Sequence, residues 1–182
     1  MPDEQQIVCR AIQHDREAFG RLYDLYADRI YKYIYYRIGN ATEAEDLTEE
    51  VFVKSWEAIG RFTWQGKSFA AWLFRIARNL VVDHFRGRRE TIALEEWSPG
   101  QGEALDPETA MERRETLRAL REAIGRLTEE QQQAILLRFI EGYSSQETAM
   151  IMGKSDEALR ALQYRALASL RRLLGPETTG WT

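Results

Sequence analysis

The stretch of sequence that decides the fold is SQETAMIMGKSDEALRALQYR, residues 145–165. Its spacing is typical of a helix-turn-helix, because a small residue, Ala149, is followed four positions later by Gly153 and six positions after that by Leu159. The small residue lets a second helix approach closely, and leucine points back into the core. Glycine suits the turn because it adopts a left-handed backbone conformation without strain.

In a helix-turn-helix the second helix enters the major groove of DNA, and its first turns face the base edges. A helical hairpin with no role in DNA binding has the same spacing, so both interpretations stay open. Asp156 and Glu157 would repel phosphates, although a glutamate also accepts a hydrogen bond from cytosine. The residues predicted to face DNA are Lys154, Ser155, Glu157, Arg160, Ala161, Tyr164 and Arg165.

Helical periodicity continues on both sides of this motif, and no alternating strand pattern occurs. Capping residues and terminal glycines predict helices at about 15–38, 42–59, 69–89, 107–126, 128–142, 144–153 and 155–174. Three of these begin with a predicted capping box, at Thr42, Thr128 and Ser144. We therefore predict an all-α protein with two small helical domains joined by a flexible acidic linker.

The predicted linker separates a first domain, residues 1–89, from a second domain, residues 113–175, which a short tail at 176–182 follows. Between residues 90 and 112 the chain has seven acidic residues and no basic one, and its Pro99, Gly100 and Gly102 break any periodicity. Asp106-Pro107 is a plausible helix start, so a helix is expected to begin within the last residues of this segment.

The formal net charge of −4 hides a basic patch in the first domain. Residues 61–89 contain seven basic side chains and one acidic one, Asp83. Such a concentration of positive charge favours binding to phosphates, whereas the alternative is a solvated helix face with no ligand.

Several classes of protein are disfavoured by what the sequence lacks. It has no apolar stretch of membrane-spanning length, and its acidic N-terminus does not resemble a signal peptide. The single cysteine, Cys9, cannot form an internal disulfide and fits a reducing compartment, so we expect a cytoplasmic protein. Only His14 and His84 are available as histidine ligands, and no phosphate-binding loop or nucleophile elbow occurs, so we expect no metal, no cofactor and no catalytic activity.

Four strings carry a family resemblance: DLTEEVFVKSWEAIGRF (46–62), SFAAWLFRIARNLVVDHFRGRR (68–89), LTEEQQQAILLRFIEGYSSQETAMIMGKS (127–155) and the pattern RAxxxLRRLL (165–174). Together they resemble the sigma-70 family, specifically the small extracytoplasmic-function (group IV) sigma factors, over about residues 10–175. Two departures concern DNA binding: Arg160-Ala161-Leu162 stands where members often have Lys-Ser-Arg, and Gly87 interrupts a run of basic residues.

The resemblance implies a promoter-recognition subunit of RNA polymerase, whose first domain binds the polymerase clamp and opens the −10 element. The implied polymerase contacts are Asp46, Glu49, Glu50, Val53, Lys54 and Glu57. The implied −10 contacts are Arg61, Phe62, Trp64, Gln65, Lys67, Ser68, Arg75, Arg78, Asn79, Arg86, Arg88 and Arg89. For Phe62 and Trp64, closing the hydrophobic core is the alternative to capturing a flipped base.

By the same resemblance, the helix-turn-helix recognises the −35 element, and the acidic linker threads through channels of the polymerase. Core RNA polymerase and promoter DNA are thus the expected partners, together with an anti-sigma factor and no membrane insertion. Two rivals remain. One is a helix-turn-helix regulator that works without being a polymerase subunit, and the other is a sigma-like protein that acts only through protein contacts.

Overall fold

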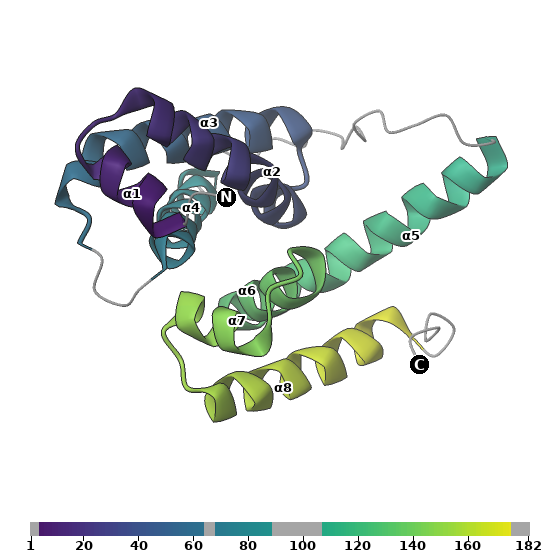
Figure 1. Ribbon diagram of the computed structural model, residues 1–182. Coiled ribbons are helices and arrows are strands. Elements are labelled where there is room, and N and C mark those ends of the chain that lie inside the picture. Colours follow the sequence, from purple (N-terminus) through teal and green to yellow (C-terminus); the bar gives the residue numbers. More distant parts are fainter. Residues whose placement is uncertain (1–3, 64–67, 89–106, 176–182) are drawn as a thin grey trace.

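The computed structural model describes residues 4–63, 68–88 and 107–175, and every element in these ranges is helical, as predicted (Figure 1). The elements in order are α1 (Glu4–Ile12), α2 (Arg16–Ile38), α3 (Ala41–Ala58), a 3₁₀ turn η1 (Ile59–Arg61), α4 (Phe69–Arg88), α5 (Pro107–Gly125), α6 (Glu129–Ile135), a π-helical turn η2 (Leu136–Ile140), α7 (Ser145–Met152) and α8 (Asp156–Leu174). Among these ranges, no helix is long and apolar enough to span a bilayer.

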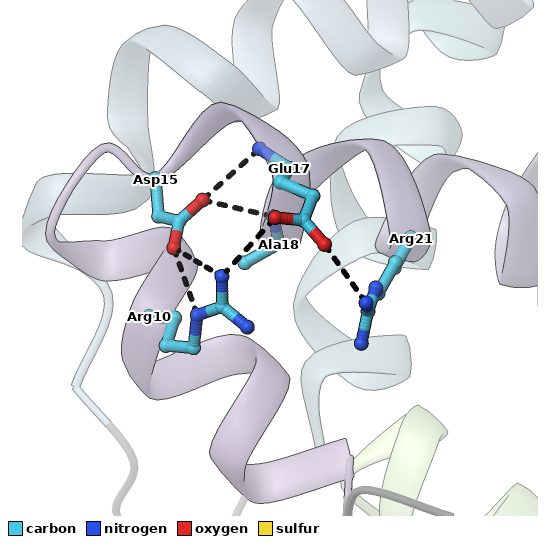
Figure 2. A network of polar contacts seen from close by, with 5 residues as sticks. All are labelled: Arg10, Asp15, Glu17, Ala18 and Arg21. Carbon is cyan, nitrogen blue, oxygen red and sulfur yellow. Dashed lines mark hydrogen bonds and ion pairs between the residues drawn. The ribbon is translucent and has the colours of Figure 1, made fainter.

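Helix α1 was not predicted from the sequence, and it is tied to the start of α2 by a polar network (Figure 2). Asp15 caps α2, because its carboxylate accepts hydrogen bonds from the backbone N–H groups of Glu17 and Ala18 at 3.0 and 3.1 Å. Arg10 of α1 donates to the other oxygen of Asp15 at 2.8 Å. The backbone hydrogen bond from Ala18 and then the Arg10 contact lower the pKa of Asp15. The network therefore fixes how the chain enters α2.

The start of α3 differs from the prediction. Asn40, not Thr42, is the capping residue, since its side chain accepts from the N–H of Glu43 at 3.1 Å. Gly39 ends α2 in a left-handed conformation with φ 84°, as its sequence position predicted. Only Gly39 and Asn40 connect α2 to α3, so the two helices lie next to each other and pack together.

The N-terminal unit, α1–α4, is built around one aromatic-rich core. Tyr33 of α2 and Phe69 and Phe74 of α4 are its largest fully buried side chains. The Tyr33 and Phe74 rings meet edge to face with centroids 5.3 Å apart, a favourable arrangement for aromatic quadrupoles. This packing fixes the rotation of α4 and therefore decides which of its side chains face outward.

The C-terminal unit, α5–α8, contains the predicted helix-turn-helix in α7 and α8. Thr128 and Ser144 form the predicted capping boxes, and Ser155 caps α8. Gly153 has the left-handed conformation, φ 63°, that the turn was expected to need. Leu159 is fully buried in a small cluster with Ala134, Ala149 and Leu162, which holds α6, α7 and α8 together.

The two units contact each other through α2 and α4 on one side and α5, η2 and α7 on the other. In Figure 1, α6, α7 and α8 lie below α4, and α5 descends from the upper right to α6. Of the predicted linker, residues 89–106 lie outside the described residues. Its last six residues, 107–112, belong to α5, in line with the expected helix start at Pro107.

Candidate nucleic-acid interface

Helix α4 is divided along its length into a buried face and an outer face. Phe69, Leu73 and Leu80 recur at helical spacing and are buried, while Trp72 and Ile76 at the edge of that face are half-buried. Because the core fixes one face, the opposite stripe must point outward. Side chains on that stripe that are exposed include Arg75, Asn79 and Arg86.

The outer stripe of α4 has the chemistry to hold DNA. Guanidinium groups bind phosphate oxygens, and the amide of Asn79 both donates and accepts, as a base edge requires. Arg86 forms a long, solvent-exposed ion pair with Asp83, 3.5 Å across, and such a pair can be exchanged for a phosphate at small cost.

Arg78, on the same stripe, is engaged by the C-terminal unit. Its Nε donates to a carboxylate oxygen of Glu129 at 2.7 Å, and this contact is the main cause that raises the Arg78 pKa. The predicted DNA contact at Arg78 is therefore occupied by a protein carboxylate in this arrangement.

The loop before α4 is described only at its two ends. Arg61 is exposed, whereas Phe62 is 8% exposed and packs on Phe69 and Trp72 with ring centroids 5.9 and 5.2 Å away. In this structure Phe62 thus lies in the core, the alternative that its sequence position left open. Ser68 is half-buried, and its hydroxyl accepts from the N–H of Ala71 at 3.2 Å.

Five predicted −10 contacts cannot be placed in full. Trp64, Gln65, Lys67 and Arg89 lie outside the described residues. Arg88 is described only as the last residue of α4.

A cleft of about 360 Å³ separates part of α4 from the C-terminal unit. Arg61, Trp72 and Arg75 line it from one side, and Met150 and Gly153 line it from the other. The stripe of α4 that is predicted to contact DNA therefore lies beside a cleft shared with the helix-turn-helix over part of its length.

Helix α3 presents an acidic outer face next to this basic stripe. The six side chains predicted to contact polymerase are all exposed: Asp46, Glu49, Glu50, Val53, Lys54 and Glu57. Val51, Phe52 and Ile59 are buried on the opposite side. Glu50 forms an i,i+4 ion pair with Lys54 at 2.9 Å on the exposed face, and Glu49, Asp46 and Glu57 add negative charge to that face.

The first turns of α8 form a third exposed surface. Glu157, Ala161 and Arg165 are exposed, and the Tyr164 side chain is 77% exposed, which is unusual for an aromatic residue with no ligand. Arg160 pairs loosely with Asp156 at 3.8 Å. Ser155 is used as the helix cap, its hydroxyl accepting from the N–H of Ala158 at 3.2 Å.

The sequence analysis missed two ion pairs that join predicted DNA contacts to acidic residues. The acids, Glu129 and Glu130, look in the sequence like ordinary acidic residues of a first helical turn. Glu129 and Glu130 open α6, where acids are favoured by the helix dipole. In the structure Glu129 binds Arg78, and Glu130 binds Lys154, a predicted DNA contact, at 2.7 Å. A carboxylate therefore pairs with one predicted phosphate ligand on each of the two surfaces that are predicted to bind DNA.

Each of the two units matches a protein-family model. Residues 22–91 match the model of sigma-70 region 2, and residues 117–170 match a model of sigma-70 region 4. The first match spans α3 and α4, and the second spans the helix-turn-helix.

Similar proteins carry the same family name over most of this chain. The ECF RNA polymerase sigma factor BldN of Streptomyces coelicolor is 46% identical over 93% of the chain, which spans 65% of that relative's length. The ECF RNA polymerase sigma factor SigX of Bacillus subtilis is 31% identical, with 86% of this chain and 83% of the relative covered. The RNA polymerase sigma-H factor of Pseudomonas aeruginosa is 32% identical over 95% of this chain and 94% of its own.

Among solved structures, CnrH in complex with the cytosolic domain of CnrY matches with a TM-score of 0.72 and 26% identity, covering 94% of this chain and 96% of that one. The shared fold, the two family regions in one order and the relatives that match over most of this chain agree with one another. This chain belongs to the sigma-70 family, within its extracytoplasmic-function RNA polymerase sigma factors.

Proposed function

We propose that this chain binds core RNA polymerase through α3 and directs it to promoters, with α4 and the preceding loop opening the −10 element and α8 reading the −35 element. It acts by binding alone and catalyses no reaction of its own. Opening the duplex requires no fuel, because contacts to the single strand offset the few kcal/mol needed to unstack each base step.

The observation that carries this proposal is the opposite chemistry of two adjacent helices. Helix α3 turns Asp46, Glu49 and Glu50 outward, while α4 turns Arg75 and Asn79 outward. The N-terminal unit thus offers one surface for a basic protein partner and another for DNA, so both can be bound at once. A regulator that works without polymerase needs only the second surface.

The α8 surface is shape-matched to a major groove but only mildly basic. Its positive charges come from Lys154, Arg160 and Arg165. The negative charges of Asp156 and Glu157 partly cancel them. We therefore assign less of the phosphate affinity to this unit than to α4, and we expect Tyr164 and Glu157 to contribute base-edge or apolar contacts.

We further propose that an anti-sigma factor binds this chain, since the similar protein CnrH is seen in complex with the cytosolic domain of CnrY. We also propose a cytoplasmic location, because that is where bacterial RNA polymerase acts.

The test is reconstitution of the full chain with core RNA polymerase, followed by co-purification and an assay of promoter opening. Glu50→Arg reverses charge at an exposed position of α3, and we expect it to abolish co-purification. Asn79→Ala removes an exposed amide on α4, and we expect it to reduce promoter opening while polymerase binding stays intact.

Matched controls exist for both variants. Glu122→Arg on α5 replaces an exposed acid that forms a comparable i,i+4 ion pair, with Arg118 at 3.1 Å, and Gln6→Ala removes an exposed amide on α1. Both controls are expected to behave as the wild type. Wild-type protein that binds DNA specifically yet never co-purifies with polymerase would favour the stand-alone regulator instead.

A further inference from the structure

The cleft between α4 and the C-terminal unit has a positively charged wall. Three arginines, Arg61, Arg75 and Arg78, are among the residues that line it, and no acidic residue is. Arg61 and Arg75 are exposed, and neither pairs with an acid within the described part of the chain. A concave surface that gathers charge of one sign attracts counter-ions more strongly than an open surface does. The cleft is therefore a candidate site for an anion.

Arg78 keeps donors for a ligand although Glu129 binds its Nε. That contact, 2.7 Å long, uses Nε alone, so the N–H groups on the two terminal nitrogens of Arg78 are not needed for it. Arg37, a second cation whose side chain is only 4% exposed, lies 3.9 Å from the same carboxylate oxygen. Two positive charges thus share one negative charge, and the net charge beside the cleft stays positive. Glu129 orients the Arg78 guanidinium without cancelling its attraction for an anion.

The same wall offers a flat aromatic surface beside these charges. The Trp72 ring is half-buried and lines the cleft, and Phe62 and Phe69 pack against it with ring centroids 5.2 and 5.5 Å away. Packing on two rings restricts how far the indole can turn, so little side-chain freedom is lost when a ligand stacks on it. Met150 lines the cleft from α7, and its thioether suits contact with an aromatic ring. The cleft therefore suits a planar aromatic group.

Gln133 on α6 brings an unused amide to the cleft. It is only 8% exposed, and it lines the cleft. Its side-chain amide forms no hydrogen bond with another of the described residues, which is uncommon because a buried polar group without a partner is destabilising. An amide both donates and accepts, as the edge of a nucleobase requires. The unused amide points to a ligand with a matching polar edge.

We propose that this cleft binds a purine nucleoside diphosphate, with its phosphates on the three arginines, its base against Trp72 and the edge of the base at Gln133. A diphosphate carries about three negative charges at neutral pH, which matches the three guanidinium groups. Guanidinium groups bind phosphate oxygens through paired donors. Two fused rings cover more of an indole than one ring does. A volume of about 360 Å³ lies near the lower end for ligand sites and suits one nucleotide.

Both units contribute to this site, which distinguishes it from a contact with promoter DNA. Arg75 and Arg78 belong to α4, whereas Gln133 and Met150 belong to α6 and α7. Neither Gln133 nor Met150 has a part in the proposed function. The inference therefore goes beyond that function, and a variant at Gln133 separates nucleotide binding from promoter opening.

The test is isothermal titration calorimetry of the full chain without Mg²⁺, using GDP, ADP, UDP, pyrophosphate and guanosine as separate titrants. GDP or ADP is expected to bind as a single molecule per chain. UDP is expected to bind more weakly because its base has one ring. Pyrophosphate and guanosine should each bind weaker by roughly ten-fold or more, because each keeps only part of the contacts.

Two variants assign the parts of the site. Gln133→Leu keeps the side-chain size and removes the amide, so it should weaken purine nucleotide binding roughly ten-fold and leave pyrophosphate binding and promoter opening unchanged. Arg75→Gln should weaken the binding of both nucleotide and pyrophosphate. The controls are Gln6→Leu on α1 and Arg118→Gln on α5, both exposed, and both should keep wild-type affinity. Far-UV circular dichroism checks that every variant keeps wild-type helix content.

Three results would overturn the site. Neither purine nucleotide could bind at millimolar concentrations, pyrophosphate could bind as tightly as the nucleotides, or a folded Gln133→Leu could keep wild-type affinity. A protein that binds the nucleotide as described but never opens a promoter with RNA polymerase would leave the site standing and contradict the proposed function instead.

Discussion

Replacing Leu159 with alanine tests whether the helix-turn-helix depends on the small separate core that supports it. Leu159 is fully buried, and its neighbours in that cluster are Ala134, Ala149 and Leu162. Two of the three are alanines, whose side chains cannot move to fill a void, but the half-buried side chain of Met152 packs against the cluster and can shift into part of it. Leucine-to-alanine changes in cores cost about 2–5 kcal/mol, and we expect a value within that range.

The effect should be confined to the C-terminal unit. The Leu159 cluster is separate from the large core that joins α1–α4 to the rest of the chain. A loss of this size is a large part of the total of about 5–15 kcal/mol that stabilises a small domain. We therefore expect amide exchange to accelerate in α7 and α8 while α2 and α4 keep their protection.

Urea unfolding followed by circular dichroism, together with hydrogen exchange, provides the measurement. Leu117→Ala is the control, because Leu117 on α5 is 40% exposed and should lose less than about 1 kcal/mol. If Leu159→Ala costs no more than Leu117→Ala, or if exchange rises equally in both units, the cluster is not what supports the helix-turn-helix.

Three further predictions concern single sites. Gly153→Ala places a side chain on a residue with φ 63° in open space, so backbone strain alone should cost about 1–2 kcal/mol in thermal or urea unfolding. Ser144→Ala removes the capping box with Glu147 and should cost about 0.5–2 kcal/mol, with faster exchange in the first turn of α7. Burial raises the pKa of Glu141 from 4.5 to about 7, with Lys32 and Arg29 opposing the shift, so the free energy of unfolding should fall as pH rises from about 4.5 to 7 and level off above it. Glu141→Gln should flatten that part of the pH profile, and an unchanged slope in the variant would show that another group titrates.

The sequence predicted most of the helices because their ends are decided locally. Gly39, Gly153, Thr128 and Ser144 terminate or cap helices through contacts within a few residues, and the structure confirms all four. The Thr42 prediction was wrong for a local reason too, since Asn40 lies two residues earlier and reaches the backbone of Glu43 first. Helix α1 was missed because its stability comes from packing Val8 and Ala11 against the core, not from its polar sequence.

The exposed faces of α3, α4 and α8 could be predicted from the sequence, because helical spacing identifies their buried faces. Helical spacing assigns one stripe to the core, and the remainder must point outward. What the sequence could not provide is which outward residues meet each other. The Arg78–Glu129 contact joins positions 51 residues apart, and Phe62 packs inward although its neighbour Arg61 is exposed. Such pairings depend on how whole units dock, which no local pattern encodes.

The absence of a side chain at Gly39 has a consequence beyond the turn it forms. No assignment made above gives this residue a contact with polymerase or DNA, yet a Cβ here would press on the guanidinium of Arg121 on α5 and would sit on a backbone with φ 84°. The end of the arginine side chain can move, so a mutation there costs mainly backbone strain and a local shift of the α2–α5 contact, with no change to any residue assigned to a ligand. Natural or laboratory variants with altered basal transcription should therefore be sought at Gly39 as well as on the surfaces that are proposed to bind promoter DNA and RNA polymerase.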